Sequence, residues 1–137
     1  MTLELAARLT AGLFLALAFG GMTFFSGVVA PLVFARLPAA TAGGFIRALF
    51  PWYYLTVGAA SALAAVALAL AGEWAAAALA GIAAAGFAAA RQGLMPRINR
   101  SRDGGNTATF NRLHRLSVVL NLVQWVLLGA ALITVLS

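Results

Sequence analysis

The sequence predicts an all-α fold, an integral membrane four-helix bundle with a short interfacial helix between helices 1 and 2. Hydrophobic residues make up 64% of the 137 residues and charged residues only 9%, whereas about a quarter of the residues in soluble domains are charged. The mean hydropathy is correspondingly high, at +0.99. The few charges separate four apolar stretches, and four crossings of about 20 residues each nearly fill residues 1–137 as a single transmembrane domain.

The first two apolar stretches predict helices at residues 6–35 and 51–72. No ionisable acid or base occurs between Arg8 and Arg36, or between Arg47 and Glu73, so each stretch is long enough to cross a bilayer. The first stretch is longer than the core of a secretory signal, which has about 7 to 15 residues. We therefore expect it to be retained as a helix.

Residues 37–50 predict the short interfacial helix. Phe45, Ile46, Leu49 and Phe50 share one helical face, and such a face can lie along the membrane surface. Pro51 follows directly and is expected to open helix 2, because the first turn of a helix needs no N–H from that position.

The last two apolar stretches predict helices at residues 74–95 and 107–136. The third helix is rich in alanine and glycine, which suits close packing against a neighbouring helix. Residues 95–108 have the sequence MPRINRSRDGGNTA and are interpreted as a hydrophilic loop. Asn106 or Thr107 is placed to cap the fourth helix.

The arginines predict the orientation of the bundle. With four crossings, the side that holds both termini carries only Arg8, and the other side carries Arg36, Arg47, Arg91, Arg97, Arg100, Arg102, Arg112 and Arg115. Basic loops stay in the cytoplasm, so we expect a bacterial inner-membrane protein with both termini outside. The net charge of +6 then reflects topology and contact with anionic membrane lipid rather than binding of nucleic acid.

Helix 4 carries a row of residues unlike the rest of that helix. The row spans a sector of about 80° and consists of Phe110, His114, Ser117, Asn121 and Gln124. Polar groups facing lipid lose water without gaining a partner, so the row is expected to face protein or a wet cavity. Helix 1 offers a matching row of small residues that brings a hydroxyl within reach of Asn121; it consists of Ala16, Gly20, Thr23, Gly27 and Ala30. These rows predict a seam between helices 1 and 4.

The candidate ligand-binding or helix-contact residues belong to this seam or are arginines of the same side of the membrane. They are Thr23, Gly27, Arg91, Arg97, His114, Ser117, Asn121 and Gln124. As helix contacts, the polar groups would fix register, because hydrogen bonds between membrane helices average about 0.6 kcal/mol. The arginines either bind an anionic headgroup or only determine the orientation of the helices in the membrane.

His114 is the only histidine, and it leaves three interpretations open: a metal or haem ligand, a proton carrier, or a side chain that faces headgroups. No second histidine or carboxylate stands at ligand spacing from it, and the chain has no cysteine, so a metal site has little support. No catalytic residues are indicated. The acidic residues lie outside the predicted spans, which argues against proton or sodium coupling.

Three stretches together resemble the family of transmembrane protein 205 and its bacterial relatives: GGMTFFSGVVAPLVFARLP leading into FIRALFPWYYL, then RQGLMPRINR, then FNRLHRLSVVLNLVQ. The resemblance implies a compact four-helix membrane bundle and no particular reaction; the eukaryotic member is associated with tolerance of platinum drugs and with vesicle traffic. It points to Phe50, Pro51, Arg91, Pro96, Arg97, His114, Ser117 and Asn121. This chain has a shorter loop between helices 3 and 4, so functions of that loop are not transferred.

Three functions fit these observations. The first is a non-enzymatic inner-membrane bundle that binds a small hydrophobic or anionic ligand, or a partner helix, at the seam between helices 1 and 4. The second is a membrane redox protein that handles haem, another tetrapyrrole or a metal through His114. The third is an assembly subunit of a larger membrane complex. Expected partners are membrane lipid and a second copy or another membrane protein.

Overall fold

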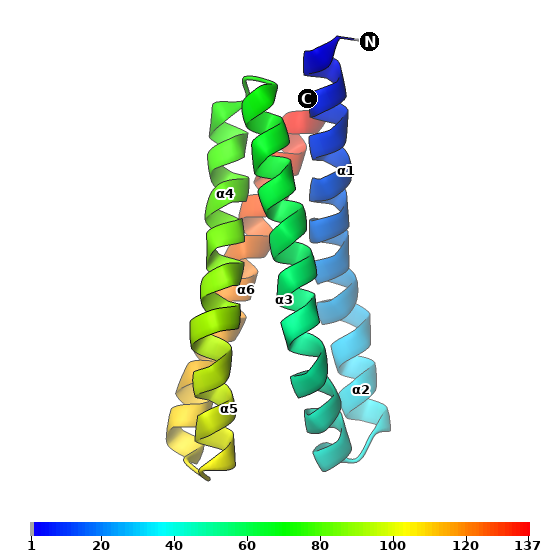
Figure 1. The fold of residues 1–137 in the computed structure, drawn as a ribbon. Helices are drawn as coiled ribbons and strands as arrows, with labels where there is room; N and C mark the ends of the chain where they lie inside the picture. The colour runs from blue at the N-terminus through cyan, green and yellow to red at the C-terminus, as the bar shows by residue number, and fades with distance from the viewer. Residues whose placement is uncertain (1) are drawn as a thin grey trace.

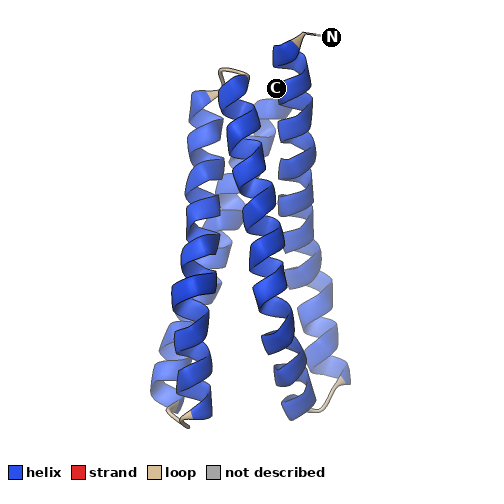
Figure 2. Cartoon of the chain, viewed as in Figure 1, coloured by secondary structure: helices blue, strands red, loops and turns tan. Residues whose placement is uncertain are grey.

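The computed structural model describes residues 2–137 and has four long helices arranged as an up-and-down bundle (Figure 1). The helices are Leu3–Arg36, Ala39–Leu70, Trp74–Asp103 and Thr107–Leu136, and each is long and apolar enough to cross a membrane. Short turns join them, and no strand occurs in the described residues (Figure 2). The predicted fold class is confirmed, and the chain is a multi-pass membrane protein.

Two of the long helices contain one wide turn each. The first consists of α1 (Leu3–Phe24), the π-helical turn η1 (Phe25–Val29) and α2 (Ala30–Arg36). The third consists of α4 (Trp74–Ala89), the π-helical turn η2 (Ala90–Leu94) and α5 (Met95–Asp103). A proline, Pro31 or Pro96, lies at the start of the segment after each wide turn. Proline lacks an N–H and crowds the carbonyl four residues earlier, and the wider turn lets the helix continue past it.

The predicted interfacial helix is not a separate element, which corrects that part of the expected topology. Residues 39–50 are the first turns of α3 (Ala39–Leu70), and α3 continues through Pro51. The break was expected because proline interrupts the hydrogen bonds of a helix. Here α3 continues through the proline, and the Arg91 Nε donates a hydrogen bond of 3.1 Å to the Pro51 carbonyl, which holds this part of α3 against η2.

The predicted loop between helices 3 and 4 is also mostly helical. Residues 95–103 form α5, and the chain turns only at residues 104–106, with Gly105 at a φ of +69°. Arginine favours helix, so the polar composition of this segment marks its exposure rather than a loop. The Asn106 Oδ1 accepts a 3.1 Å hydrogen bond from the Thr109 N–H and begins α6 (Thr107–Leu136), which confirms Asn106 as the cap.

The half of the bundle near the termini is held together by small side chains. Its core is mostly alanine, contributed by α1, α3 and α4, and includes Ala11, Ala18, Ala60, Ala64, Ala80 and Ala83. Small residues let helix backbones approach closely, which is the main source of packing energy between membrane helices. Gly58 marks such an approach, since a Cβ there would lie 3.1 Å from the Cβ of Phe87.

The two ends of the bundle differ in charge. The terminal end holds both chain termini and the turn between α3 and α4, where Arg8 and Glu73 form a 3.7 Å ion pair. The opposite end, called the arginine end below, holds the turns at residues 37–38 and 104–106. Each of the last two long helices has 30 residues and is about 45 Å long, about 15 Å more than the hydrocarbon layer. Residues 97–103 hold four of the charged side chains of this end and occupy about 10 Å of helix, so this segment fits within the length that extends beyond the layer.

Candidate functional site

The first two long helices form one hairpin of the bundle, and the last two form the other. A cavity of about 400 Å³ lies between these two hairpins, in the half of the bundle near the arginine end. In Figure 1 the segments α2 and α3 diverge here from α5 and α6. Residues of α3, α5 and α6 line most of the cavity, and Phe34 of α2 adds to its wall. The volume falls within the range of small-molecule sites, about 300 to 1,000 Å³.

The cavity wall is divided between apolar and polar side chains. The apolar part comprises Phe34, Ile46, Phe50, Met95, Ile98 and Phe110. The polar part comprises Arg47, Tyr54, Asn99, Arg102, His114 and Ser117. This combination suits a ligand that has both an apolar body and a polar group.

Arg47 and Asp103 join the two hairpins beside the cavity. The Arg47 Nη1 and Nη2 donate hydrogen bonds of 2.6 and 2.8 Å to the two carboxylate oxygens of Asp103. Each guanidinium nitrogen meets its own oxygen, the planar fork in which arginine binds carboxylates most strongly. Asp103 ends α5 beyond the hydrocarbon layer, and its hydrogen bonds to Arg47 lower the pKa of its carboxyl group.

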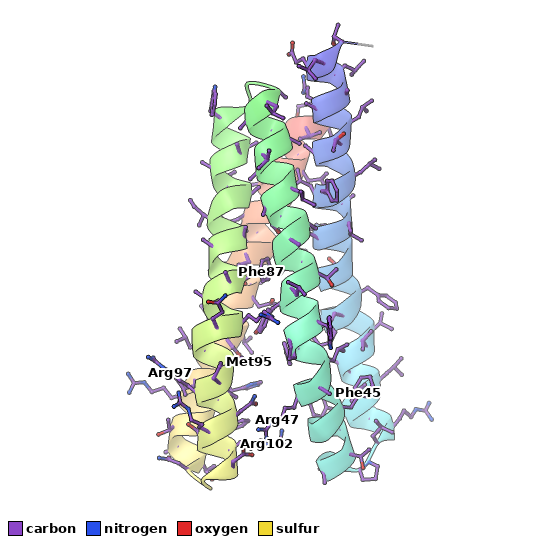
Figure 3. All side chains as sticks on the ribbon, in the orientation of Figure 1. Phe45, Arg47, Phe87, Met95, Arg97 and Arg102 are labelled. Carbon is purple, nitrogen blue, oxygen red and sulfur yellow. The ribbon has the colours of Figure 1, made fainter. Side chains whose placement is uncertain are left out.

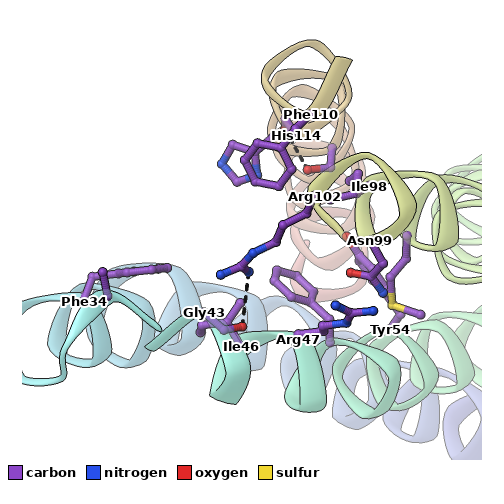
Figure 4. Close-up of a pocket in the computed structure, with 14 residues that line it drawn as sticks. Phe34, Gly43, Ile46, Arg47, Tyr54, Ile98, Asn99, Arg102, Phe110 and His114 are labelled. Atoms are coloured by element: carbon purple, nitrogen blue, oxygen red, sulfur yellow. Dashed lines mark hydrogen bonds between the residues drawn. The ribbon is translucent and has the colours of Figure 1, made fainter. Parts of the chain in front are cut away.

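Arg102 crosses the cavity from α5 towards α3 (Figure 4). Its Nη1 lies 3.5 Å from the Gly43 carbonyl oxygen, a long hydrogen bond. A Cβ at Gly43 would collide with the guanidinium group. Glycine at this position therefore makes room for a second cation on the cavity wall.

Aromatic rings close the deep end of the cavity, away from the arginine end. Phe50 lies 5.3 Å from Tyr54 and 5.8 Å from Tyr53 between ring centroids. Phe87 extends this aromatic layer from α4, at 6.3 Å from Tyr54. Aromatic pairs at these separations attract one another beyond the effect of burial alone, so the layer forms a firm end wall.

The polar residues of α6 have different surroundings along the helix. His114 and Ser117 line the cavity, and the exposed His114 ring stacks on Phe110 at 5.7 Å. Asn121 lies at the aromatic layer, where its Oδ1 accepts a 3.1 Å hydrogen bond from the Tyr53 hydroxyl. Gln124 is only 2% exposed, and its Nε2 donates a 3.3 Å hydrogen bond to the Ala83 carbonyl of α4.

The predicted small-residue surface of helix 1 does not face Asn121. Four of its five residues are exposed and Ala30 is half-buried, whereas the buried face of α1 consists of Ala7, Ala11, Leu15, Ala18 and Met22. Within the described residues, an added Cβ at Gly20 or Gly27 would meet no atom within 4 Å. Thr23 does contact α6, but its hydroxyl accepts a 2.8 Å hydrogen bond from Trp125 Nε1. The predicted pairing of this surface with Asn121 is therefore wrong.

The family described as a domain of unknown function, DUF4149, matches residues 13–107 of this chain. The chain belongs to the DUF4149 family. No curated protein and no solved structure matches it. The DUF4149 match includes all of α3, α4 and α5, and thus Arg47, Arg102 and Asp103. It ends at the first residue of α6, so His114 and the polar residues after it lie outside the match.

Two arginines predicted from the sequence have unlike surroundings within the DUF4149 segment. Arg91 is half-buried and bonded to the Pro51 carbonyl, which ties η2 to α3. Arg97 is exposed and points away from the space between the hairpins, whereas Arg47 and Arg102 lie between them (Figure 3). Of these four arginines, only Arg47 and Arg102 line the cavity.

Sequence reasoning missed Arg47, Tyr54, Asn99 and Arg102 as site residues of this DUF4149 chain. Arg47 and Asp103 are 56 positions apart, and Asp103 was assigned to a loop. The sequence offered one indication of this contact: Arg47 and Asp103 lie near the same end of the two hairpins, where opposite charges can meet. In the described part of the chain, no group of three or more His, Cys, Asp or Glu residues is placed to hold a metal ion.

Proposed function

We propose that this DUF4149 chain is a non-enzymatic membrane protein of the transmembrane protein 205-like type that binds a small amphiphilic anion in the cavity between α3, α5 and α6. The observation that supports the proposal is the division of one 400 Å³ cavity into an apolar wall and a wall with two arginines. The ligand site thus differs from the seam between helices 1 and 4 that the sequence predicted.

Electrostatics favours an anion over a cation or a neutral amphiphile. Arg47 and Arg102 line the cavity, and within residues 2–137 Asp103 is the one carboxylate near them, because Glu4 and Glu73 belong to the terminal end. A guanidinium group binds carboxylate and phosphate headgroups through charge-assisted hydrogen bonds, which are stronger than those between neutral groups. The apolar residues deeper in the cavity then take the hydrophobic part of the same molecule.

We further propose that the arginine end faces the cytoplasm of a bacterium and that the protein resides in the inner membrane. The support is the asymmetry of the arginines, eight on one side of the four spans and Arg8 alone on the other. In this orientation an amphiphile reaches the arginines of the cavity from the inner leaflet or the cytoplasm.

The test is native mass spectrometry, together with a visible absorption spectrum, on protein extracted from its own membrane. Wild type is compared with Arg102→Gln, and Arg97→Gln serves as a matched control because Arg97 is exposed and lies outside the cavity. We expect wild type and Arg97→Gln to retain a bound amphiphilic anion and Arg102→Gln to lose it. Equal retention by all three proteins, or a bare chain in each, would contradict the proposal.

The same experiment separates the cofactor alternative. A haem absorption band that disappears in His114→Ala would contradict the proposed function and show that His114 is a haem ligand. Protein that binds an anion and shows no visible band in either form supports the amphiphile proposal. Co-purification of a fixed partner protein with an otherwise empty cavity would favour the assembly-subunit alternative.

A further inference from the structure

We propose that the amphiphile is a single-chain carboxylate, and that its headgroup binds Arg47 by displacing the carboxylate of Asp103. This inference rests on the proposed function and specifies the ligand class of the same cavity. Asp103 then acts as an internal competitor that holds Arg47 until a ligand arrives.

The first support is the geometry of the pair. Arg47 holds both oxygens of a carboxylate at 2.6 and 2.8 Å, so the fork is already arranged for this chemical group. The side chains of Arg47 and Asp103 are 41% and 57% exposed. Ion pairs this open to water contribute little stability, and a ligand that adds apolar burial to an equivalent pair can replace Asp103.

The second support is the balance of charge. Asp103 lies near Arg102 as well as Arg47, and both cations act on it electrostatically. When a monoanionic carboxylate takes Arg47, Asp103 can remain beside Arg102, and two cations are matched by two anions. A doubly charged phosphate monoester at Arg47 would leave one negative charge unmatched, which is costly near an apolar wall.

The third support is the size of the apolar wall. The cavity of about 400 Å³ has room for roughly a dozen methylene groups if each occupies about the 30 Å³ of a water molecule. This is one acyl chain rather than two. From Arg47, the chain would extend past Ile46 and Phe50 of α3 and Met95 of α5 towards the aromatic layer.

The experiment measures binding of three probes that share a dodecyl-length chain to the full chain in nanodiscs of neutral phosphatidylcholine. The probes are dodecanoate, dodecyl phosphate and dodecyltrimethylammonium. We expect dodecanoate to bind at least tenfold more tightly than either of the other two. Arg47→Gln should weaken dodecanoate binding at least tenfold, and Arg97→Gln should leave it unchanged.

Asp103→Asn tests whether the ligand displaces the Asp103 carboxylate from Arg47 or only binds near this pair. Removing the internal carboxylate should tighten dodecanoate binding several-fold, a gain that a misfolded variant would not give. Unchanged or weaker binding by Asp103→Asn would overturn the displacement. Tighter binding of dodecyl phosphate than of dodecanoate, with both dependent on Arg47, would overturn the carboxylate class and leave the proposed function standing. If no probe binds, or if the cationic probe binds as well as the anions, the proposed function fails.

Discussion

Tyr53 donates a 3.1 Å hydrogen bond from its hydroxyl to the Oδ1 of Asn121, and this bond joins α3 to α6 near the middle of both helices. Tyr53 is buried and Asn121 half-buried. At this depth in a membrane no bulk water competes for either group. The pair therefore links the two hairpins just beyond the deep end of the cavity.

We predict that Tyr53→Phe and Asn121→Leu each lower the melting temperature in detergent, because each leaves the other polar group without its partner. A double-mutant cycle on the unfolding free energy should give a coupling of about 0.6 kcal/mol, the average for hydrogen bonds between membrane helices. Thr10→Val is the control, since the exposed Thr10 hydroxyl bonds only within its own helix. Zero coupling between Tyr53 and Asn121 would mean that the bond contributes nothing to the fold.

Two glycines of α4 provide a matched test of packing. A Cβ at Gly86 would lie 2.7 Å from Gln124 Nε2, whereas one at Gly81 would lie 4.0 Å from the Cβ of Ala65, an ordinary contact. We predict that Gly86→Ala lowers the melting temperature, because the buried Gln124 amide must move and lose its bond to Ala83. Gly81→Ala should preserve or raise it, because alanine favours helix by up to about 1 kcal/mol. Equal effects of the two substitutions would show that Gln124 moves freely.

Part of this arrangement could be predicted from the sequence. Composition and charge spacing were enough for four helices, since apolar length decides a crossing. In the polar row on α6, Asn121 and Gln124 face protein as expected, because each side chain forms a hydrogen bond with a neighbouring helix. Their partners were not predictable, because which faces meet depends on how the helices rotate as they pack.

Local rules failed at the prolines and at the arginine end. Pro51 was expected to begin a helix and instead lies inside α3, where a neighbouring arginine bonds to its carbonyl. The polar segment before Gly104 was expected to be a loop and is helical, which carries Asp103 to Arg47. The cavity forms between residues that are far apart in the sequence, so patterns among neighbouring residues could not locate it.

The proposed orientation predicts where reporters become active. A reporter enzyme that functions only outside the cytoplasm should be active when fused after Ser137, because the C-terminus belongs to the terminal end. The same reporter inserted after Gly104 should be inactive, since the turn at residues 104–106 belongs to the arginine end. The opposite pattern would reverse the orientation, and activity at both sites would contradict a crossing by α6, the one span between them.

The pair of Arg47 and Asp103 predicts an effect of pH on the joined hairpins. Hydrogen bonds from Arg47 lower the pKa of Asp103 in the folded protein below its unfolded value of about 3.9. A depressed carboxyl pKa contributes stability that is fully present above the unfolded pKa and is lost as the pH falls through the folded pKa. At pH 7, wild type should therefore melt slightly higher than Asp103→Asn, which has no charge to pair with Arg47.

This difference in melting temperature should shrink as the pH falls below 3.9 and vanish below the folded pKa of Asp103. Both proteins share every other residue, so contributions from the rest of the chain cancel in the difference. Arg47→Gln should behave like Asp103→Asn at pH 7, because either substitution removes the same bonds. A difference that stays the same size at every pH would assign the effect to the shape of the Asp103 side chain instead of its charge.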